Sequence, residues 1–379
     1  MRTLQIGDDW PGERITGLNR YFVELTRCLP ATGTEAQGLV VGSREILAEA
    51  AGTVVPFANS HDPLYKRLYR ARRAARKLNR EKKFDLVASH FALYAAPLPP
   101  ELKRLPLVVH FHGPWAAESN VEGSKGQRSS FKFSIERRVY NRARRFIVLS
   151  QSFQQELAAN YGIDEDRIRL VRGGVDTERF NMSMSRTEAR GLLGWPEERP
   201  VIFTVRRLVR RMGLENLIDA MTLVVARVPD VMLMLGGAGP IAGELKTRIR
   251  ERGLENNIQL LGRVSEEHLP LAYRAADMTV VPSQALEGFG LITVESLASG
   301  TPVLATPVGG LPEVIQPFAP ECLFTDVSAD AITSLLLQVL QSELCLPSEE
   351  RCRAYAVENF SWPRIARQVR SVYDEALDA

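Results

Sequence analysis

The sequence predicts an α/β protein built from two Rossmann-like, doubly wound domains. With 379 residues the chain is too long for one hydrophobic core of ordinary size, so we expect two domains. The second half repeats strand, turn and helix four times in series, a pattern typical of a parallel sheet with helices on both faces. The first half opens with a strand, a glycine loop and a helix, the layout at the start of such a sheet.

The composition describes a soluble globular protein, with 45% hydrophobic and 25% charged residues. The first residues, MRTLQIGDDW, lack a charged start followed by an apolar run, so we expect no secretory signal. No apolar stretch reaches the roughly 18–20 residues that span a bilayer. The cysteines lack paired metal-type spacing, which favours buried thiols in a reducing cytoplasm over disulfides or zinc ligands. They are Cys28, Cys322, Cys345 and Cys352.

The two halves differ in charge, although the whole chain carries only +3. Residues 1–176 hold 28 Lys and Arg against 19 Asp and Glu, which gives +9. Residues 177–379 hold 20 against 26, which gives −6. The first half is therefore the candidate surface for an anionic partner.

Residues 64–83 are the most basic stretch, with ten basic residues against one acid. Their apolar residues recur at helical spacing and form one stripe: Leu64, Leu68, Ala71, Ala75 and Leu78. The favoured interpretation is a solvated helix that packs through this stripe. The alternative is a surface helix held to anionic lipid, although the stripe has no large aromatic residue at its centre.

The first strand, residues 4–6, leads through a loop to Gly17 and a helical pattern. This order suits a nucleotide or phosphate site, because a helix N-terminus offers free N–H groups. A plain strand-to-helix turn would show the same pattern, so both interpretations stay open for Gly17.

Three histidines follow or end two predicted strands, residues 84–89 and 107–111. His90 and His112 emerge beyond the carboxyl ends of these strands, where parallel sheets bind their ligands. His110 and His112 are two positions apart, so on a strand they point to the same face. A histidine in such a place is more often structural than functional, and we interpret His90 and His110 as structural.

Further strands are expected at 146–150, 168–171, 201–205, 231–235 and 258–261. Ser150 is a suitable N-cap for the helix that follows the first of these. The strand at 201–205 runs into a basic loop, RRLVRRMG (206–213), and the strand at 231–235 ends in the glycine-rich turn GGAGP (236–240). Such a turn is common and carries little information alone.

A helical segment between two short apolar runs, at 278–282 and 302–306, opens on Gly288 and Gly290. Its first N–H groups are unshielded by side chains, which suits an anionic or hydroxyl-rich ligand. Glu287 and Glu295 bracket the segment, and eight positions are just over two helical turns. Both carboxylates are therefore expected on one face of the helix.

These residues resemble a known family. EGFGLITVE (287–295) resembles the paired-glutamate signature of retaining glycosyltransferases of family 4, which have the GT-B fold. SGTPVLATPVGGLPEVI (299–315) resembles the segment that follows it in that family. The resemblance covers nearly the whole chain and is strongest from 201 to 315.

The resemblance implies two Rossmann-like domains that face each other across a cleft. RGGVDTERF (172–180) resembles the connector, with Gly173 and Gly174 as a natural hinge. The expected domains are residues 1–176 on the acceptor side and 177–360 on the donor side. The tail helix at 361–379 would cross back to pack on the first domain, with Trp362, Ile365, Val369 and Tyr373 on its apolar face.

The resemblance also implies roles by position. Glu295 would hold the ribose hydroxyls, and Glu287 and His112 would face the transferred sugar. The Val264 backbone would recognise the base edge, and Arg207 would neutralise the diphosphate. The donor site would be completed by Gly17, Gly237, Phe289, Gly290 and Leu291.

One departure lies in the basic loop, where the family pattern places a lysine and this chain has Met212. Arg211 is the expected substitute and, with Arg207, would stabilise the leaving diphosphate. No metal or other cofactor is expected, because the chain has no Asp-x-Asp motif in a suitable loop. Retention through attack on the same face is implied by the family alone.

The favoured function is a cytoplasmic hexosyltransferase in polysaccharide or glycoconjugate assembly, with no nucleic-acid partner. The expected donor is a UDP-hexose, with UDP-glucose favoured over GDP-mannose, and the acceptor is a sugar or a lipid-linked sugar. Contact with the inner face of the membrane would involve residues 64–83. The alternatives are another GT-B enzyme, such as an epimerase or phosphorylase, and a catalytically silent nucleotide-sugar binding subunit.

Overall fold

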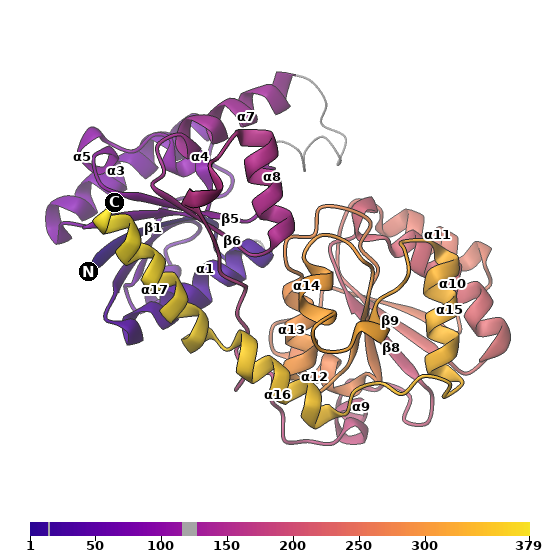
Figure 1. Ribbon diagram of the computed structural model, residues 1–379. Helices are drawn as coiled ribbons and strands as arrows, with labels where there is room; N and C mark the ends of the chain where they lie inside the picture. Colours follow the sequence, from indigo (N-terminus) through magenta and orange to yellow (C-terminus); the bar gives the residue numbers. More distant parts are fainter. Residues whose placement is uncertain (14–15, 116–126) are drawn as a thin grey trace. The chain divides into compact units, whose positions relative to one another are not determined.

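The computed structural model describes residues 1–13, 16–115 and 127–379, which divide into two compact units (Figure 1). Unit 1 comprises Met1–Gly174 and Trp362–Ala379, and unit 2 comprises Val175–Ser361. Each unit contains one parallel β-sheet covered by helices on both faces, so the predicted α/β class is confirmed. No helix in the described part of the chain is long and apolar enough to cross a membrane.

Unit 1 has a seven-stranded parallel sheet in the order β3-β2-β1-β4-β5-β6-β7. Its strands are β1 (Arg2–Asp9), β2 (Glu35–Val41), β3 (Val54–Ala58), β4 (Leu86–Ser89), β5 (Leu107–Phe111), β6 (Arg145–Val148) and β7 (Ile168–Leu170). Its helices are α1 (Gly17–Cys28), α2 (Ile46–Glu49), α3 (Leu64–Lys82), α4 (Ala92–Ala95), α5 (Pro100–Lys103), α7 (Gln127–Tyr140), α8 (Gln151–Tyr161) and α17 (Trp362–Asp378). Figure 1 shows α3, α4, α7 and α8 over one face of the sheet and α1 and α17 over the other.

Strands β2 and β3 were not predicted from the sequence. Gly38 interrupts the apolar run of β2, and Pro56 interrupts that of β3, so both stretches resemble loops. Pro56 is tolerated because β3 is an edge strand, where a backbone N–H on the solvent side needs no partner in the sheet.

Helix α3 packs through the inner part of its predicted stripe. Ala71, Ala75 and Leu78 are buried, and the helix contacts β3 and β2. Leu64, expected on the same stripe, is 38% exposed because it begins the helix beyond the edge of this packing. Ser150 caps α8 as predicted, and its side chain accepts a hydrogen bond from the backbone N–H of Phe153 at 3.2 Å.

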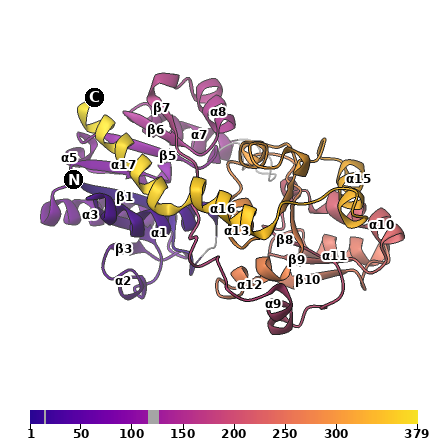
Figure 2. The same ribbon diagram turned by 60° about the horizontal axis from the view of Figure 1, so that its bottom comes forward.

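The tail helix α17 belongs to unit 1 (Figure 2). The four residues of its expected apolar face are all buried: Trp362, Ile365, Val369 and Tyr373. The helix packs against α1, β5 and β6. At its start Trp362 lies so close to Gly174 that a Cβ added there would sit 2.5 Å from the indole ring. Glycine is therefore required where the chain leaves unit 1.

Unit 2 has a five-stranded parallel sheet in the order β10-β9-β8-β11-β12. Its strands are β8 (Val201–Val205), β9 (Met232–Gly236), β10 (Ile258–Gly262), β11 (Met278–Val281) and β12 (Val303–Ala305). Its helices are α9 (Arg186–Leu193), α10 (Leu214–Arg227), α11 (Ala242–Glu251), α12 (His268–Ala275), α13 (Leu291–Ala298), α14 (Leu311–Ile315), α15 (Ala329–Leu340) and α16 (Glu349–Phe360). Each strand coincides with a predicted strand to within a residue or two at either end.

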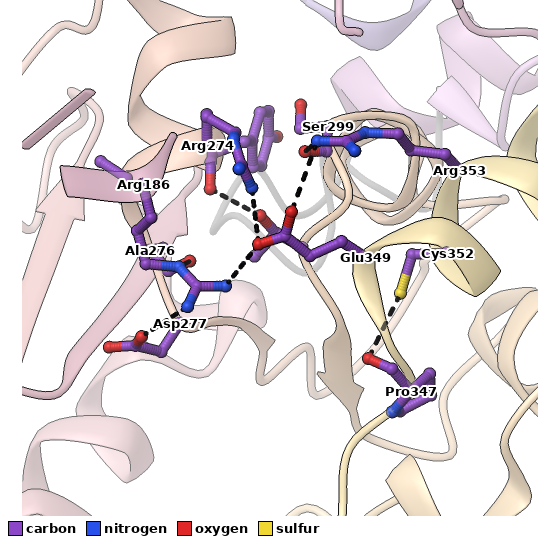
Figure 3. Close-up of polar contacts among 12 residues, drawn as sticks. Arg186, Arg274, Ala276, Asp277, Ser299, Pro347, Glu349, Cys352 and Arg353 are labelled. Carbon is purple, nitrogen blue, oxygen red and sulfur yellow. Dashed lines mark hydrogen bonds and ion pairs between the residues drawn. The ribbon is translucent and has the colours of Figure 1, made fainter. Parts of the chain in front are cut away.

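An ion-pair network joins α9, α12 and α16 on one side of unit 2 (Figure 3). The carboxylate of Glu349 lies 2.8 Å from Arg274, 3.2 Å from Arg186 and 3.7 Å from Arg353. Arg353 also donates to the carbonyl oxygen of Ser299, just after α13. Partial burial favours the neutral acid, but the three guanidinium groups hold the pKa of Glu349 below its ordinary value. One carboxylate therefore connects α9, α12 and α16, and Arg353 extends the network to the end of α13.

Substituting Glu349→Gln should destabilise unit 2, because buried Arg274 would lose its carboxylate partner. We expect the free energy of unfolding to fall by about 2 kcal/mol near neutral pH, less than for a fully buried pair, because Glu349 keeps 30% exposure. The effect should vanish as the pH falls through the folded-state pKa, below the ordinary value of 4.5, since the native carboxylate is then protonated too. Chemical denaturation at several pH values measures the loss of unfolding free energy and its dependence on pH. The variant Glu350→Gln, at an exposed neighbouring position, is the control. An equal loss in the two variants would contradict the role of the network.

Candidate active site

Several predicted donor-side residues lie just after strands, at the carboxyl edge of the unit 2 sheet. Arg207 follows β8 next to Arg206, Gly237 follows β9, and Val264 follows β10. The loop between β11 and α13 carries Glu287, and the loop after β12 carries Gly309. In open parallel sheets this edge is where ligands bind.

Glu287 lies in the loop before α13 and not on the helix. Gly290 adopts a left-handed conformation with φ +73° and is the N-cap, so the helix begins only at Leu291. The prediction that Glu287 and Glu295 share one helical face is therefore wrong. Glu295 alone is on α13, and Glu287 has partners of its own.

Glu287 forms a buried ion pair with Arg206. The two side chains are 13% and 5% exposed, and a guanidinium nitrogen of Arg206 contacts Glu287 Oε2 directly. The Ser283 hydroxyl donates to the same carboxylate oxygen at 2.8 Å. Burial alone would raise the pKa of Glu287, but Arg206, Ser283 and Arg211 outweigh it and lower the pKa. Glu287 is therefore an anion whose charge is neutralised within the site.

Glycines fix the backbone that carries this carboxylate. Gly309 adopts φ +57°, and a Cβ there would lie 1.9 Å from the carbonyl oxygen of Glu287. The N–H of Gly310 donates to that same oxygen at 2.9 Å. Gly309 and Gly310 thus bring a second loop against Glu287.

Arg211 supports the same loop from the other side. It is 7% exposed, and its guanidinium donates to the carbonyl oxygen of Leu286 at 2.9 Å. Leu286 has φ +52°, a strained conformation for a residue with a branched side chain. Arg211 therefore has a structural partner next to Glu287, and its predicted contact with a diphosphate stays a prediction. Arg207 is half-buried.

Glu295 lies in the second turn of α13 and is 6% exposed. The hydroxyl of Tyr273, on α12, donates to Glu295 Oε2 at 3.0 Å. Tyr273 is fully buried, so this contact fixes the carboxylate from inside the unit. The ribose-binding role of Glu295 stays a prediction.

The remaining donor-side residues have structural settings of their own. Gly237 has φ +139°, and a Cβ there would lie 1.8 Å from the carbonyl oxygen of Arg206, so glycine brings two strand-end loops together. Phe289 is 2% exposed and its ring packs against Phe360. Leu291 is half-buried at the first position of α13.

The two predicted residues of unit 1 are Gly17 and His112. Gly17 is the first residue of α1, whose N-terminus is capped by the Thr16 side chain. His112 follows β5, and its ring is stacked with that of His110 as the alternation predicted, 6.4 Å apart. Burial lowers the pKa of His112 to about 3, so this side chain is neutral near pH 7.

Four residues whose side chains contact those of predicted residues were not assigned from the sequence. Arg206 and Ser283 contact Glu287, Tyr273 contacts Glu295, and Nδ1 of His90 lies 3.3 Å from Nε2 of His112. Arg206 and His90 each directly follow a strand, and this position could have identified them as site residues. Ser283 shows no such signal, because its contact depends on how the loop folds.

The described residues contain no group of three or more histidine, cysteine, aspartate or glutamate side chains placed to hold a metal ion. What the unit 2 edge offers is one buried acid–guanidinium pair, further arginines and the open N-terminus of α13. This combination suits a ligand that carries both hydroxyl groups and anionic oxygens.

Comparison with known proteins identifies both halves of the chain. Residues 15–179 match the model of Glycosyltransferase Family 4, and residues 185–359 match that of Glycosyl transferases group 1. D-inositol 3-phosphate glycosyltransferase of Corynebacterium glutamicum is 32% identical over 308 residues, 78% of this chain and 73% of the relative. MMP alpha-(1->4)-mannosyltransferase of Mycolicibacterium hassiacum is 30% identical over 322 residues, 80% of this chain and 74% of the relative.

Solved structures share the fold along the whole chain. HepE of Anabaena, in complex with UDP and glucose, has a TM-score of 0.81 at 20% identity, covering 99% of this chain and 100% of HepE. WaaG, a glycosyltransferase of lipopolysaccharide biosynthesis, has a TM-score of 0.76 at 18% identity, covering 97% and 99%. With the relatives above, these similarities establish that the chain belongs to glycosyltransferase family 4 and is a glycosyltransferase with the GT-B fold.

Proposed function

We propose that this glycosyltransferase moves a hexose from a UDP-sugar, with UDP-glucose favoured, to an acceptor in polysaccharide or glycoconjugate biosynthesis, with retention of configuration. The observation that carries the proposal is the buried Arg206–Glu287 pair beside the α13 N-terminus, at the carboxyl edge of the unit 2 sheet. HepE, which shares the fold, has been solved with UDP and with UDP-glucose, which supports the choice of donor. The acceptor is less constrained, since relatives are named for inositol phosphate and for mannosyl transfer.

The proposed chemistry depends on charge. When the bond to the diphosphate breaks, negative charge grows on the leaving group and the sugar becomes cationic in character. Glu287, ionised and held in place by Arg206, would offer its carboxylate oxygens to the sugar as hydrogen-bond acceptors. Arg207, Arg211 and the free N–H groups of α13 would stabilise the diphosphate without a metal ion.

Glu295 would bind the nucleoside part of the donor. Its carboxylate accepts a hydrogen bond from Tyr273, and a carboxylate can accept several hydrogen bonds. Two adjacent ribose hydroxyls would donate to it, and Tyr273 would keep the carboxylate oriented for them. The rest of the donor would contact Gly17, Gly237, Val264, Phe289, Gly290 and Leu291.

Peripheral contact with an anionic membrane, at the cytoplasmic face, forms a second part of the proposal. Tyr65 and Tyr69 lie one turn apart on α3 and are 68% and 65% exposed, and further along the helix Arg70, Arg73 and Lys77 face solvent. Aromatic rings next to cations suit a lipid interface.

A Tyr65→Ser, Tyr69→Ser variant should sediment less with vesicles that contain phosphatidylglycerol. Equal sedimentation with zwitterionic vesicles would contradict the charge argument.

A panel of nucleotide sugars tests the donor. Ligand at 100 times its Kd stabilises the folded state by about 2.7 kcal/mol, so UDP-glucose should raise the melting temperature by several degrees. The Glu295→Ala variant should lose most of that increase. A larger increase with GDP-mannose would overturn the choice of UDP, and none with any nucleotide sugar would overturn the donor class.

Donor hydrolysis in the absence of acceptor separates the enzyme from its alternatives. Release of UDP from UDP-glucose is expected of a transferase and excludes a silent binding subunit. Production of a second nucleotide sugar would instead indicate an epimerase, and phosphate-dependent release of sugar phosphate would indicate a phosphorylase.

Arg211→Ala should lower turnover on the order of 10²-fold, the scale seen when one charge-stabilising group is lost. Arg210→Ala is the matched control, because Arg210 is 67% exposed and paired with Glu215 and Glu244, and it should leave turnover nearly unchanged. Adding Met212→Lys to Arg211→Ala separates two causes. A new cation should restore part of the turnover if the diphosphate is the partner of Arg211. No restoration would show that the contact with Leu286 is what matters.

A further inference from the structure

Three histidine side chains stack at the ends of β4 and β5 in unit 1. The rings of His90 and His110 are 4.1 Å apart and nearly parallel, and those of His90 and His112 are 5.6 Å apart. His90 and His110 are 3% and 2% exposed. Burial, followed by repulsion within the group, lowers the pKa of His90 and of His110. All three are neutral near pH 7, so each ring carries one proton on one of its two nitrogens.

The position of these protons follows from Gln5, on β1. The Thr3 hydroxyl donates to the carbonyl oxygen of Glu35 at 3.5 Å, so it accepts from Gln5 Nε2 at 2.8 Å. That contact orients the Gln5 amide and leaves its Oε1 as an acceptor for the Tyr373 hydroxyl at 3.2 Å and for His90 Nε2 at 3.0 Å. His90 therefore carries its proton on Nε2, and its Nδ1 has a lone pair.

The lone pair on His90 Nδ1 determines which nitrogen of His112 carries the proton. Nε2 of His112 lies 3.3 Å away and must be the protonated nitrogen if the two are to form a hydrogen bond. Because His112 is neutral, its Nδ1 then carries no proton. His112 makes no other hydrogen bond within the described part of the chain, so Nδ1 can accept one from a ligand.

A second branch from Gln5 places the proton of His110. The Tyr373 hydroxyl donates to Gln5, so it accepts from His110 Nε2 at 2.8 Å. His110 Nδ1 is then unprotonated and accepts from the Tyr21 hydroxyl at 3.3 Å. Every donor in the network has an acceptor. The reverse order would turn the Gln5 amide and make the Thr3 hydroxyl its donor, which would break the Thr3 contact with the carbonyl oxygen of Glu35, so that contact fixes the direction of the whole network.

We infer that His90 is a positioning residue that fixes His112 in the tautomer with a bare Nδ1, so that His112 accepts a hydrogen bond from a hydroxyl group of the transferred sugar. The inference rests on the proposed function and on the position of His112 that the family resemblance implies, facing the transferred sugar. His112 would then select a donor with a hydroxyl at this point and would not act as an acid or as a cation. The hydrogen bonds of Gln5 and Tyr373 determine which nitrogens of the histidines carry the protons.

Histidine tautomers can be read directly by long-range ¹H–¹⁵N correlation spectra of protein labelled with ¹⁵N only in histidine. The chain has five histidines, so few signals need assignment by single variants. We expect His90, His110 and His112 in the Nε2–H form in the ligand-free protein. A His112 signal of the Nδ1–H form, or of imidazolium, near neutral pH would overturn the inference.

Tyr373→Phe tests the order of the network in the same spectra. It removes the acceptor of His110 Nε2 but leaves Gln5 as the acceptor of His90. The His110 signals should change while His112 stays in the Nε2–H form. A changed tautomer at His112 would show that Gln5 does not fix the protons.

An isosteric pair of variants tests the functional consequence. Asn and Leu at position 90 have the same shape, and only the Asn Oδ1 can replace the acceptor at Nδ1. His90→Leu should lower kcat for UDP-glucose hydrolysis about tenfold, with UDP affinity unchanged, because His112 loses its fixed proton. His90→Asn should restore most of this loss. Equal kcat values for the two variants would overturn the positioning role.

The spectra of the native protein and of Tyr373→Phe fail separately from the proposed function, whereas the kcat comparison depends on it. The spectra need no substrate, so they decide the tautomer even if the donor assignment is wrong. If no nucleotide sugar is hydrolysed by the native protein, the proposed function fails while the proton order still stands or falls on the spectra.

Discussion

The buried pair of Arg206 and Glu287 is the interaction on which the unit 2 site depends. Removing two charges from water is costly, and the pair is stable only if both groups find further partners. Ser283 supplies one for each, and the loops after β8, β9 and β12 approach closely enough to exclude water because Gly237 and Gly309 have no side chain. Two glycines, a serine and an arginine look unrelated in the sequence. In the structure they all help to form or support one ion pair.

Unit 1 buries neutral polar rings at the ends of β4 and β5, because burial lowers the pKa values of His90, His110 and His112. A neutral network has low desolvation cost but requires each donor to have one acceptor, so its geometry is strict. Unit 2 thus has a fixed ion pair at the edge of its sheet, whereas the histidines of unit 1 form hydrogen bonds of fixed direction.

Much of the fold could be predicted because it depends on local patterns. Continuous apolar runs located β8 and β5, and a serine before a polar helix located the cap at Ser150. The site was harder, because the contact of Arg206 with Glu287 spans 81 positions. Arg206 and Arg207 are adjacent at a strand end, and no local pattern tells which one turns inward. The spacing of Glu287 and Glu295 gave a wrong prediction for a related reason. Gly290 is left-handed and the helix begins only after it, and helical spacing in a sequence does not show at which residue a helix begins.

Unit 1 is made of two segments, with all of unit 2 between them in the chain. During synthesis, the first segment leaves the ribosome without α17, so the surface that later covers Trp362, Ile365 and Tyr373 stays open to solvent. At ~5–20 residues per second, translating unit 2 takes about 10–40 s. Unit 2 can therefore fold before unit 1 is complete, and the nascent first segment is the part of the molecule that most needs protection from aggregation. The order of maturation is then the reverse of the order of synthesis.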